Sequence, residues 1–323
     1  MIFSFNARCL AGVFFLLMLA ACSTPQTKAL RSPTHLNLAA HVELREVAYF
    51  PQDEYQCGPA SLAMIFHSAG INIEPEQLKD SLYIPDKQGS LQIEMLAATR
   101  RQGLLAYLLQ PKLQDVLTEI SAGNPVVVLQ NLGLSWYPVW HYAVAIGYDL
   151  NTEEIILRSG STQRLRMPFT TFEHTWARSQ YWAMVALPPS RIPQTAKPEN
   201  YIQSITALQH SSPSTDVGSA YTAAMLRWPD SLLAKIAAGN HAYSRGDLNL
   251  AEQIFRKASQ VHPDSAAGFN NLALTLSDQG KFDSALQAIQ RALEIGGPLE
   301  PMVRNTLAKI EQKKLAAQPG AVK

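Results

Sequence analysis

Between residues 42 and 187, the apolar positions of the chain follow helical and strand-like periods in turn. Three segments have the apolar spacing of helices, namely 61–70, 91–101 and 113–122. Three later apolar runs predict strands, at 126–129, 141–148 and 154–157, and a turn around Asn151 joins the last two. Helices early and a sheet late indicate an α+β domain over 42–187.

The pattern changes after a proline-rich stretch, and we expect a linker over 188–216 followed by an all-α domain over 217–317. Small and aromatic positions recur there with a period of 34 residues: Gly239, Gly246, Ala251, Phe255 and Ala258 return as Ala273, Gly280, Ala285, Ile289 and Ala292. Period and residue types resemble the tetratricopeptide repeat (TPR). The resemblance implies repeats over about 232–265 and 266–299, a partial repeat before them, a capping helix after them, and a surface that binds a partner protein.

The N-terminal segment 1–21 carries one charge, Arg8, and then an uncharged run that is too short to span a bilayer. This pattern is typical of a signal peptide. The end of the run, Leu19-Ala20-Ala21-Cys22, resembles the lipobox of bacterial lipoproteins, which implies acylation of Cys22 and a membrane anchor. Ser23 after the cysteine favours the outer membrane, facing the periplasm. An ordinary signal peptide with an incidental cysteine is the alternative, and in either case the polar stretch 22–41 predicts a tether.

Composition and charge exclude several classes of protein. The chain has 323 residues, 47% of them hydrophobic, and its net charge is +1, so neither wholesale disorder nor a nucleic-acid binder is expected. A phosphate-binding G-x-x-x-x-G-K-[ST] loop is absent from the sequence, and so are H-E-x-x-H and paired C-x-x-C motifs. We therefore expect no nucleotide, no metal and no other cofactor.

Cysteine usage directs attention to one residue. Of three cysteines, Cys9 lies in the segment to be removed and Cys22 is the expected lipid site, which leaves Cys57. Gly58-Pro59 after it predicts the first turn of a helix, where the macrodipole and free amides would lower the pKa of the thiol. A glutamine upstream could donate to an oxyanion, and both Gln52 and Gln56 are candidates.

A thiol nucleophile needs a base, and of the eight histidines His141 is best placed for that task. His67 lies ten residues along the same helix, about 15 Å from Cys57. His35 and His41 lie in the expected tether, and His174 follows Phe172 in a later helical stretch. His210, His241 and His262 belong to the linker or the repeats. His141 begins the strand "HYAVAIGYD", where it could face a helix N-terminus.

The motifs "QCGPASLAM" and, 84 residues on, "HYAVAIGYD" resemble the family-39 cysteine peptidases, papain-like domains that remove double-glycine leaders from bacteriocin precursors. The resemblance covers about 46–187 and implies Cys57 as nucleophile, His141 as general base and an upstream glutamine as oxyanion donor. The family's glutamine usually stands six positions before the cysteine, whereas Gln52 stands five before it; we favour Gln52 over Gln56.

The third member of the catalytic set departs from the family, which has an aspartate after the histidine. A hairpin turning near residues 151 and 152 would bring 159–162 beside 141–144, and no carboxylate occurs there. Asp149 lies about 26 Å along the strand from His141. Ser159, another hydroxyl or a backbone carbonyl would then orient the imidazole.

Three functions are compatible with these residues. The first is a membrane-anchored thiol peptidase whose repeats recruit a peptide or protein substrate, or a partner protein. The second is a degenerate peptidase fold that binds peptides without cutting them. The third is an acyltransferase that passes the Cys57 thioester to an amine.

Overall fold

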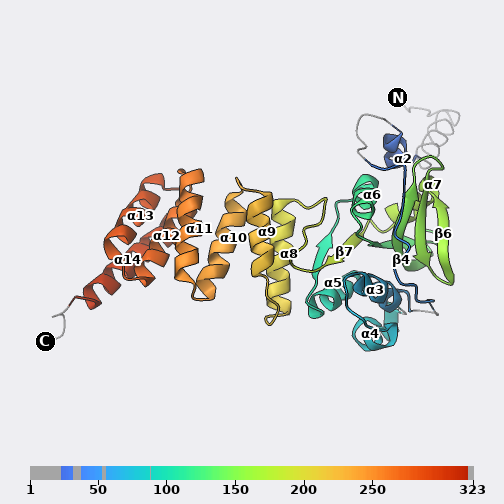
Figure 1. Cartoon of the computed structure of the whole chain (residues 1–323), viewed down its shortest axis with the longest axis horizontal. Helices are drawn as coiled ribbons and strands as arrows, with labels where there is room; N and C mark the ends of the chain where they lie inside the picture. Colours follow the sequence, from blue (N-terminus) through green and yellow to red (C-terminus); the bar gives the residue numbers. More distant parts are fainter. Residues whose placement is uncertain (1–22, 32–37, 53–55, 88, 319–323) are drawn as a thin grey trace, which may run out of the picture. The chain divides into compact units, whose positions relative to one another are not determined.

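A computed structural model of the chain describes residues 23–31, 38–52, 56–87 and 89–318. The chain divides into two compact units (Figure 1). The first unit contains residues 1–98 and 108–186, and the second contains 99–107 and 187–323. The segment 99–107, which lies within the α+β domain expected over 42–187, clusters with the helical second unit.

A seven-stranded sheet forms the centre of the α+β fold, in the order β2-β7-β3-β4-β5-β6, with β1 paired to β4. Its strands are β1 (His41–Glu43), β2 (Leu105–Leu108), β3 (Val126–Asn131), β4 (Trp140–Asp149), β5 (Glu154–Ser159), β6 (Thr162–Pro168) and β7 (Ala183–Leu187). The neighbours β3, β4, β5 and β6 pair antiparallel in succession. The long strand β4 lies between β3 and β5, and its residues 142–148 are buried.

Helices surround this sheet: α2 (Pro25–Leu30), α3 (Cys57–Ser68), α4 (Pro75–Leu82), α5 (Gln92–Arg101), α6 (Leu113–Ser121) and α7 (Phe169–Ala177). A 3-10 turn spans Pro85–Lys87. Helix α3 packs on β3 and β4, and its residues 58–66 are all buried, so it is a core helix rather than an amphipathic surface one. Gly70, at φ +85°, follows the end of α3 as predicted.

The elements predicted from the pattern are confirmed as α3, α5, α6, β3, β4 and β5, and α7 contains the later helical stretch expected around His174; α4, β2, β6 and β7 were not foreseen. The β4–β5 hairpin pairs residues whose numbers sum to 303 near its turn, as expected. Beyond a bulge between Ala145 and Gly147 the sum becomes 302, as in the pair of Val144 and Arg158.

Two elements, α2 and the first residue of β1, lie within the stretch 22–41 that we expect to be a tether. Helix α2 packs on α6 and α7, and His41 is the first residue of β1, opposite Asp149. The carboxylate of Glu173 in α7 accepts hydrogen bonds from Gln26 N, Thr27 N and Thr27 Oγ1, at 3.0, 2.7 and 2.7 Å. These bonds fix the N-terminal turn of α2, which a polar sequence alone does not reveal.

The second unit is helical: α8 (Pro198–Ser211), α9 (Gly218–Arg227), α10 (Leu232–Ser244), α11 (Leu248–Val261), α12 (Ala266–Asp278), α13 (Phe282–Ile295) and α14 (Glu300–Ala316). Helix α8 lies within the expected linker, and its residues Tyr201, Ile205 and Leu208 are buried. The pairs α10–α11 and α12–α13 coincide with the two predicted repeats, and α14 with the predicted cap.

Small residues in the repeats have the expected packing role. A Cβ added at Gly239 would lie 2.4 Å from the ring of Phe255, so only glycine lets α10 and α11 approach so closely. Gly246 and Gly280, at φ +78° and +76°, end the first helix of each pair. Within the described residues, no helix combines the length and apolar character required to cross a bilayer.

Candidate active site

Cys57 is the first residue of α3, as the Gly-Pro signal predicted. Its side chain lies where backbone N–H groups converge: those of Tyr142, Gly58 and Cys57 itself stabilise the thiolate. The glycine that follows is required by space, because a Cβ at position 58 would lie 2.3 Å from Ser90 Oγ. Cys57 is therefore held against the first residues of β4.

Burial nevertheless dominates the acidity of this thiol. Removal of the Cys57 side chain from water raises its pKa, and the three backbone donors offset that effect only in part. The expectation that the helix N-terminus would lower the pKa of the thiol is therefore wrong. Burial therefore opposes ionisation of this thiol, while the backbone donors favour it.

His141 is the second residue of β4, and Gln130 of β3 lies opposite it. Its Nε2 lies 2.9 Å from Ser159 Oγ, and burial lowers the pKa of the imidazole. With Nε2 engaged by the hydroxyl, Nδ1 is the other ring nitrogen. A neutral imidazole whose Nε2–H donates to Ser159 presents a lone pair at Nδ1, which is the form a general base requires.

Ser159 is the last residue of β5, and only 9% of its surface is exposed. The β4–β5 pairing brings the end of β5 back to the beginning of β4, which accounts for its contact with His141. Burial is the cause of the lowered pKa of His141. The His141 partner in this structure is a neutral hydroxyl.

Gln52 is bound to the turn that follows Ser159. Its backbone N donates to Gly160 O at 3.2 Å, and its Oε1 accepts from Gly160 N at 2.9 Å. Its Nε2 donates to Ser61 Oγ at 3.3 Å, one helical turn after Cys57. The amide of Gln52 thus bridges α3 and the β5–β6 turn. Gln56, the other candidate, is the N-cap residue of α3 and caps it without a side-chain hydrogen bond.

Several residues that complete the site were not found from sequence. Tyr142 supplies a backbone donor to the thiol, and its hydroxyl donates to Ser90 O at 3.3 Å. Tyr49 OH donates to Gly160 O at 3.0 Å, and Gly160 has the left-handed φ of +56°. These contacts join segments more than 50 residues apart. The one available signal was Gly160 itself, a turn glycine directly after Ser159.

The other described histidines have different neighbours. His67 Nε2 lies 3.2 Å from Ile73 O, and the ring of His67 packs edge-on against Phe50. His41 lies 3.5 Å from Asp149, His241 packs against Tyr221, and His262 contacts Asp230 O at 2.7 Å. His174 and His210 belong to α7 and α8, and His35 lies outside the described residues. Over the part of the chain that the structure describes, His, Cys, Asp and Glu side chains form no cluster suited to a metal ion.

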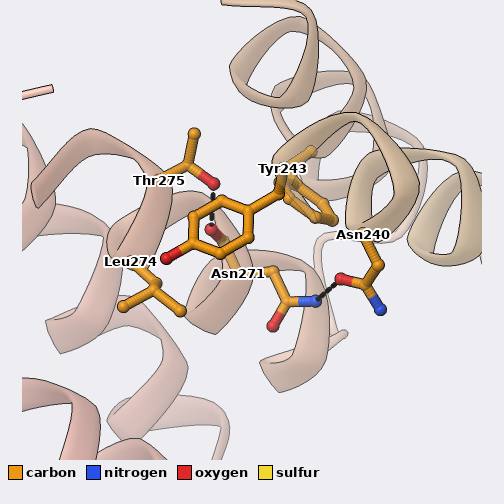
Figure 2. Close-up of a pocket in the computed structure, with 6 residues that line it drawn as sticks. Asn240, Tyr243, Asn271, Leu274 and Thr275 are labelled. Atoms are coloured by element: carbon orange, nitrogen blue, oxygen red, sulfur yellow. Dashed lines mark hydrogen bonds between the residues drawn. The ribbon is translucent and has the colours of Figure 1, made fainter. Parts of the chain in front are cut away.

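The second unit has a cavity of about 170 Å³ on its repeats (Figure 2). It is lined by Asn240 and Tyr243 of α10, Phe255 of α11, and Asn271, Leu274 and Thr275 of α12. Asn271 Nδ2 donates to Asn240 Oδ1 at 3.0 Å, so the two amides hold each other beside aromatic and aliphatic carbon. The cavity thus combines amide groups with apolar surface.

Comparison with known proteins gives consistent results for both units. Residues 44–184 match the Peptidase_C39 like family, and residues 265–296 match a tetratricopeptide repeat. A Bacillus anthracis protein described as a C39-like peptidase is 19% identical, with a TM-score of 0.39 over 46% of this chain and 98% of that one. The peptidase domain of Streptococcus ComA, a bi-functional ABC transporter involved in a quorum sensing pathway, is 20% identical, with a TM-score of 0.37 over 44% of this chain and 99% of that one. No curated protein matches the chain.

Proposed function

Because residues 44–184 form a Peptidase_C39-like domain with a TPR after it, we propose that the chain is a membrane-anchored cysteine peptidase. Cys57 is the nucleophile and His141 the general base. The observation that carries the proposal is the arrangement of His141: its Nε2 is bound by Ser159, and the residue after it donates its backbone N–H to the Cys57 thiol.

In the proposed reaction His141 Nδ1 accepts the thiol proton as Cys57 Sγ attacks the peptide carbonyl carbon. The oxyanion that forms accepts hydrogen bonds from Cys57 N–H and from Gln52 Nε2. To donate to the oxyanion, Gln52 Nε2 gives up its hydrogen bond to Ser61 Oγ. His141 then gives its proton to the leaving amine, the C–N bond breaks and a thioester remains. Water, deprotonated by His141, hydrolyses the thioester and releases the carboxylic acid, and the thiol regains its proton.

Ser159 is proposed as a positioning residue that holds the ring of His141 through Nε2. A hydroxyl fixes the tautomer without adding charge, so the imidazolium formed during the reaction is stabilised less than it would be beside a carboxylate. The turn at Gly160 ties Ser159 and Gln52 together, so both proposed supporting residues depend on one local structure.

Location and recruitment complete the proposal. Acylation of Cys22 would hold the protein on the outer membrane, facing the periplasm, and the lipobox residues Leu19–Cys22 support this. The repeats would bind the substrate or a partner protein, and the cavity between α10 and α12 offers amide and apolar groups for a peptide.

The reactivity of Cys57 tests the peptidase proposal before a substrate is known. In a chain that starts at Ser23, Cys57 is the single thiol, so mass spectrometry locates any adduct. We expect alkylation by iodoacetamide near pH 7 to slow at least about tenfold in His141→Ala, because the buried thiol depends on a base to ionise. The matched control, His67→Ala, should react like the parent chain.

A rate that is indifferent to His141 and follows an ordinary thiol curve would overturn the peptidase proposal. It would favour the second candidate, a peptide-binding module without catalysis, for which the neutral partner of His141 is the specific argument. Product analysis in the presence of an added amine separates hydrolysis from acyl transfer, because only transfer joins that amine to the cleaved peptide.

A further inference from the structure

The connection between β3 and β4 exposes an unusual amount of apolar surface. We call residues 132–140 the aromatic hairpin. Trp136 and Tyr137 at its tip are 81% and 70% exposed, and four more of its side chains are about half exposed: Leu132, Leu134, Val139 and Trp140. Exposed apolar patches on a folded domain mark surfaces that contact something else.

The aromatic hairpin is a built structure rather than a loose loop. Leu132 N donates to Val139 O at 2.8 Å, and Leu134 and Tyr137 exchange backbone hydrogen bonds at 3.0 and 3.1 Å. At its base, Asn131 Oδ1 accepts from the backbone N–H groups of Gly133 and Val139, both at 2.9 Å. The hairpin therefore holds its apolar side chains outward at little cost in conformational entropy.

Helix α7 connects this hairpin with the N-terminal helix. Glu173 of α7 binds the first turn of α2, as described above, and Arg178, five residues later, donates to Asn131 O and Gly133 O at 3.1 and 2.6 Å. Five helical residues span about 7.5 Å. Figure 1 shows α2 beside α7, in agreement with their packing. The start of α2 and the base of the hairpin thus lie on neighbouring parts of one helix.

The chain length before α2 limits how far a lipid on Cys22 could be from this place. Cys22 itself lies outside the described residues, and only Ser23 and Thr24 separate it from Pro25, the first residue of α2. Three residue steps reach about 10 Å when fully extended. An anchor at Cys22 would therefore keep the α2–α7 side of the first unit, and with it the aromatic hairpin, close to the bilayer surface.

We propose that the aromatic hairpin inserts into the interface of a phospholipid bilayer. Residues 126–148 contain no Asp, Glu, Lys or Arg, so the hairpin itself brings no charge into the interface. Tryptophan and tyrosine, flanked by leucine and valine, are the side chains that favour this depth. Arg178 at the hairpin base is exposed and can meet lipid phosphates.

A peptide substrate is the competing occupant. It fits less well at the tip, because Trp136 stands five residues before His141, about 16 Å along an extended strand. A peptide residue at the tip would therefore be several residues away from the scissile bond at Cys57.

The membrane contact would also have a consequence for the proposed peptidase. Because Trp140 directly precedes His141, the active site would work on polypeptide segments at the membrane surface.

Vesicle binding tests this inference without the lipid anchor. The chain from Ser23 onward keeps every described residue, and Cys57→Ala in all variants removes catalysis from the readout. We expect it to co-sediment with vesicles of phosphatidylethanolamine and phosphatidylglycerol, and brominated lipids to quench its tryptophan fluorescence. Trp136→Ser with Tyr137→Ser should lower the partition coefficient at least about tenfold, equivalent to about 1.4 kcal/mol. Trp136→Ser alone should have a smaller effect of the same sign.

The matched control is Leu226→Ser with Met302→Ser, which removes two exposed apolar side chains from the helical unit, 78% and 55% exposed, and should leave binding unchanged. Thermal unfolding verifies that each variant is folded. Absence of vesicle binding by the parent chain, or equal binding by parent and hairpin variant, overturns the inference. The hairpin contacts the peptide substrate instead of the bilayer if vesicle binding is unchanged and the hairpin variant with Cys57 intact has a raised KM for a soluble peptide. The proposed peptidase activity could stand or fail independently of each result.

Discussion

The carboxylate of Glu173 and the hydroxyl of Ser159 are both buried in the first unit, and they hold their neighbours in opposite ways. Glu173 is 2% exposed and accepts three hydrogen bonds from the first turn of α2. Ser159 is 9% exposed and offers His141 a single uncharged contact. A buried carboxylate thus occurs where several donors surround it, whereas the described partner of His141 is an uncharged hydroxyl.

The difference indicates where the catalytic proton resides. Burial lowers the pKa of His141 and raises the pKa of Cys57. Both directions favour the neutral thiol and the neutral imidazole over the ion pair. The proposed peptidase would therefore transfer the proton during attack on the substrate rather than before it.

The largest effect is expected at the proposed active site, when the oxyanion donor Gln52 is removed. Gln52→Ala should reduce kcat on a cleaved peptide by about 10²-fold, because a donor to the developing charge is lost. Gln56→Ala serves as the matched control and should retain most of the activity, since the side chain of Gln56 does not cap α3. A larger loss in Gln56→Ala would assign the donor to Gln56, and equal losses would contradict the preference for Gln52.

An intermediate effect is expected at Glu173, whose carboxylate holds the first turn of α2. Glu173→Gln replaces one acceptor oxygen with an NH2 group facing the donors of α2 and should lower the free energy of unfolding by about 2 kcal/mol. Urea denaturation measures this change. Glu46→Gln, at an exposed carboxylate, is the control and should stay within about 0.5 kcal/mol of the parent. If Glu173→Gln leaves the free energy of unfolding unchanged, this carboxylate does not hold α2.

The smallest effect, and the sharpest test of the comparison, concerns Ser159 and pH. Because the pKa of His141 is lowered, the base is unprotonated at neutral pH, and the acid limb of kcat/KM should lie below the ordinary histidine value of about 6.5. Ser159→Ala should cost about tenfold in rate. Ser159→Asp should move the acid limb to higher pH, because a carboxylate stabilises the protonated imidazole.

The pH–rate profiles of the three chains, parent, Ser159→Ala and Ser159→Asp, decide this point. Ser159→Ala is the control for loss of the contact without added charge. An acid limb that stays in place in Ser159→Asp would show that residue 159 does not act on the ring that titrates.

How much could be predicted from sequence depends on how local each feature is. The start of α3 at Cys57 follows from Gly58-Pro59, and the approach of Ser159 to His141 follows from a hairpin whose turn residues are visible in the sequence. The pKa of Cys57 was predicted in the wrong direction, because burial depends on the whole core and not on the helix N-terminus alone.

The features that were missed depend on contacts between distant segments. Gln52 binds Gly160 across 108 residues, and Thr27 binds Glu173 across 146. Neither partner carries a local signal: Glu173 lies within an otherwise ordinary helical segment, and the residues of α2 resemble a polar tether. Tertiary packing determines which residues meet at such positions, and the local pattern of a single sequence does not indicate it.

The docking of α2 also has a consequence for the order of events during synthesis. Among the described helices α2 is made first, yet the carboxylate that receives it is made 146 residues later. The chain emerges from its N-terminus, so α2 has no binding site until α7 has been produced and folded. Throughout that interval the first turn of α2 lacks the acceptor that holds it in the folded first unit.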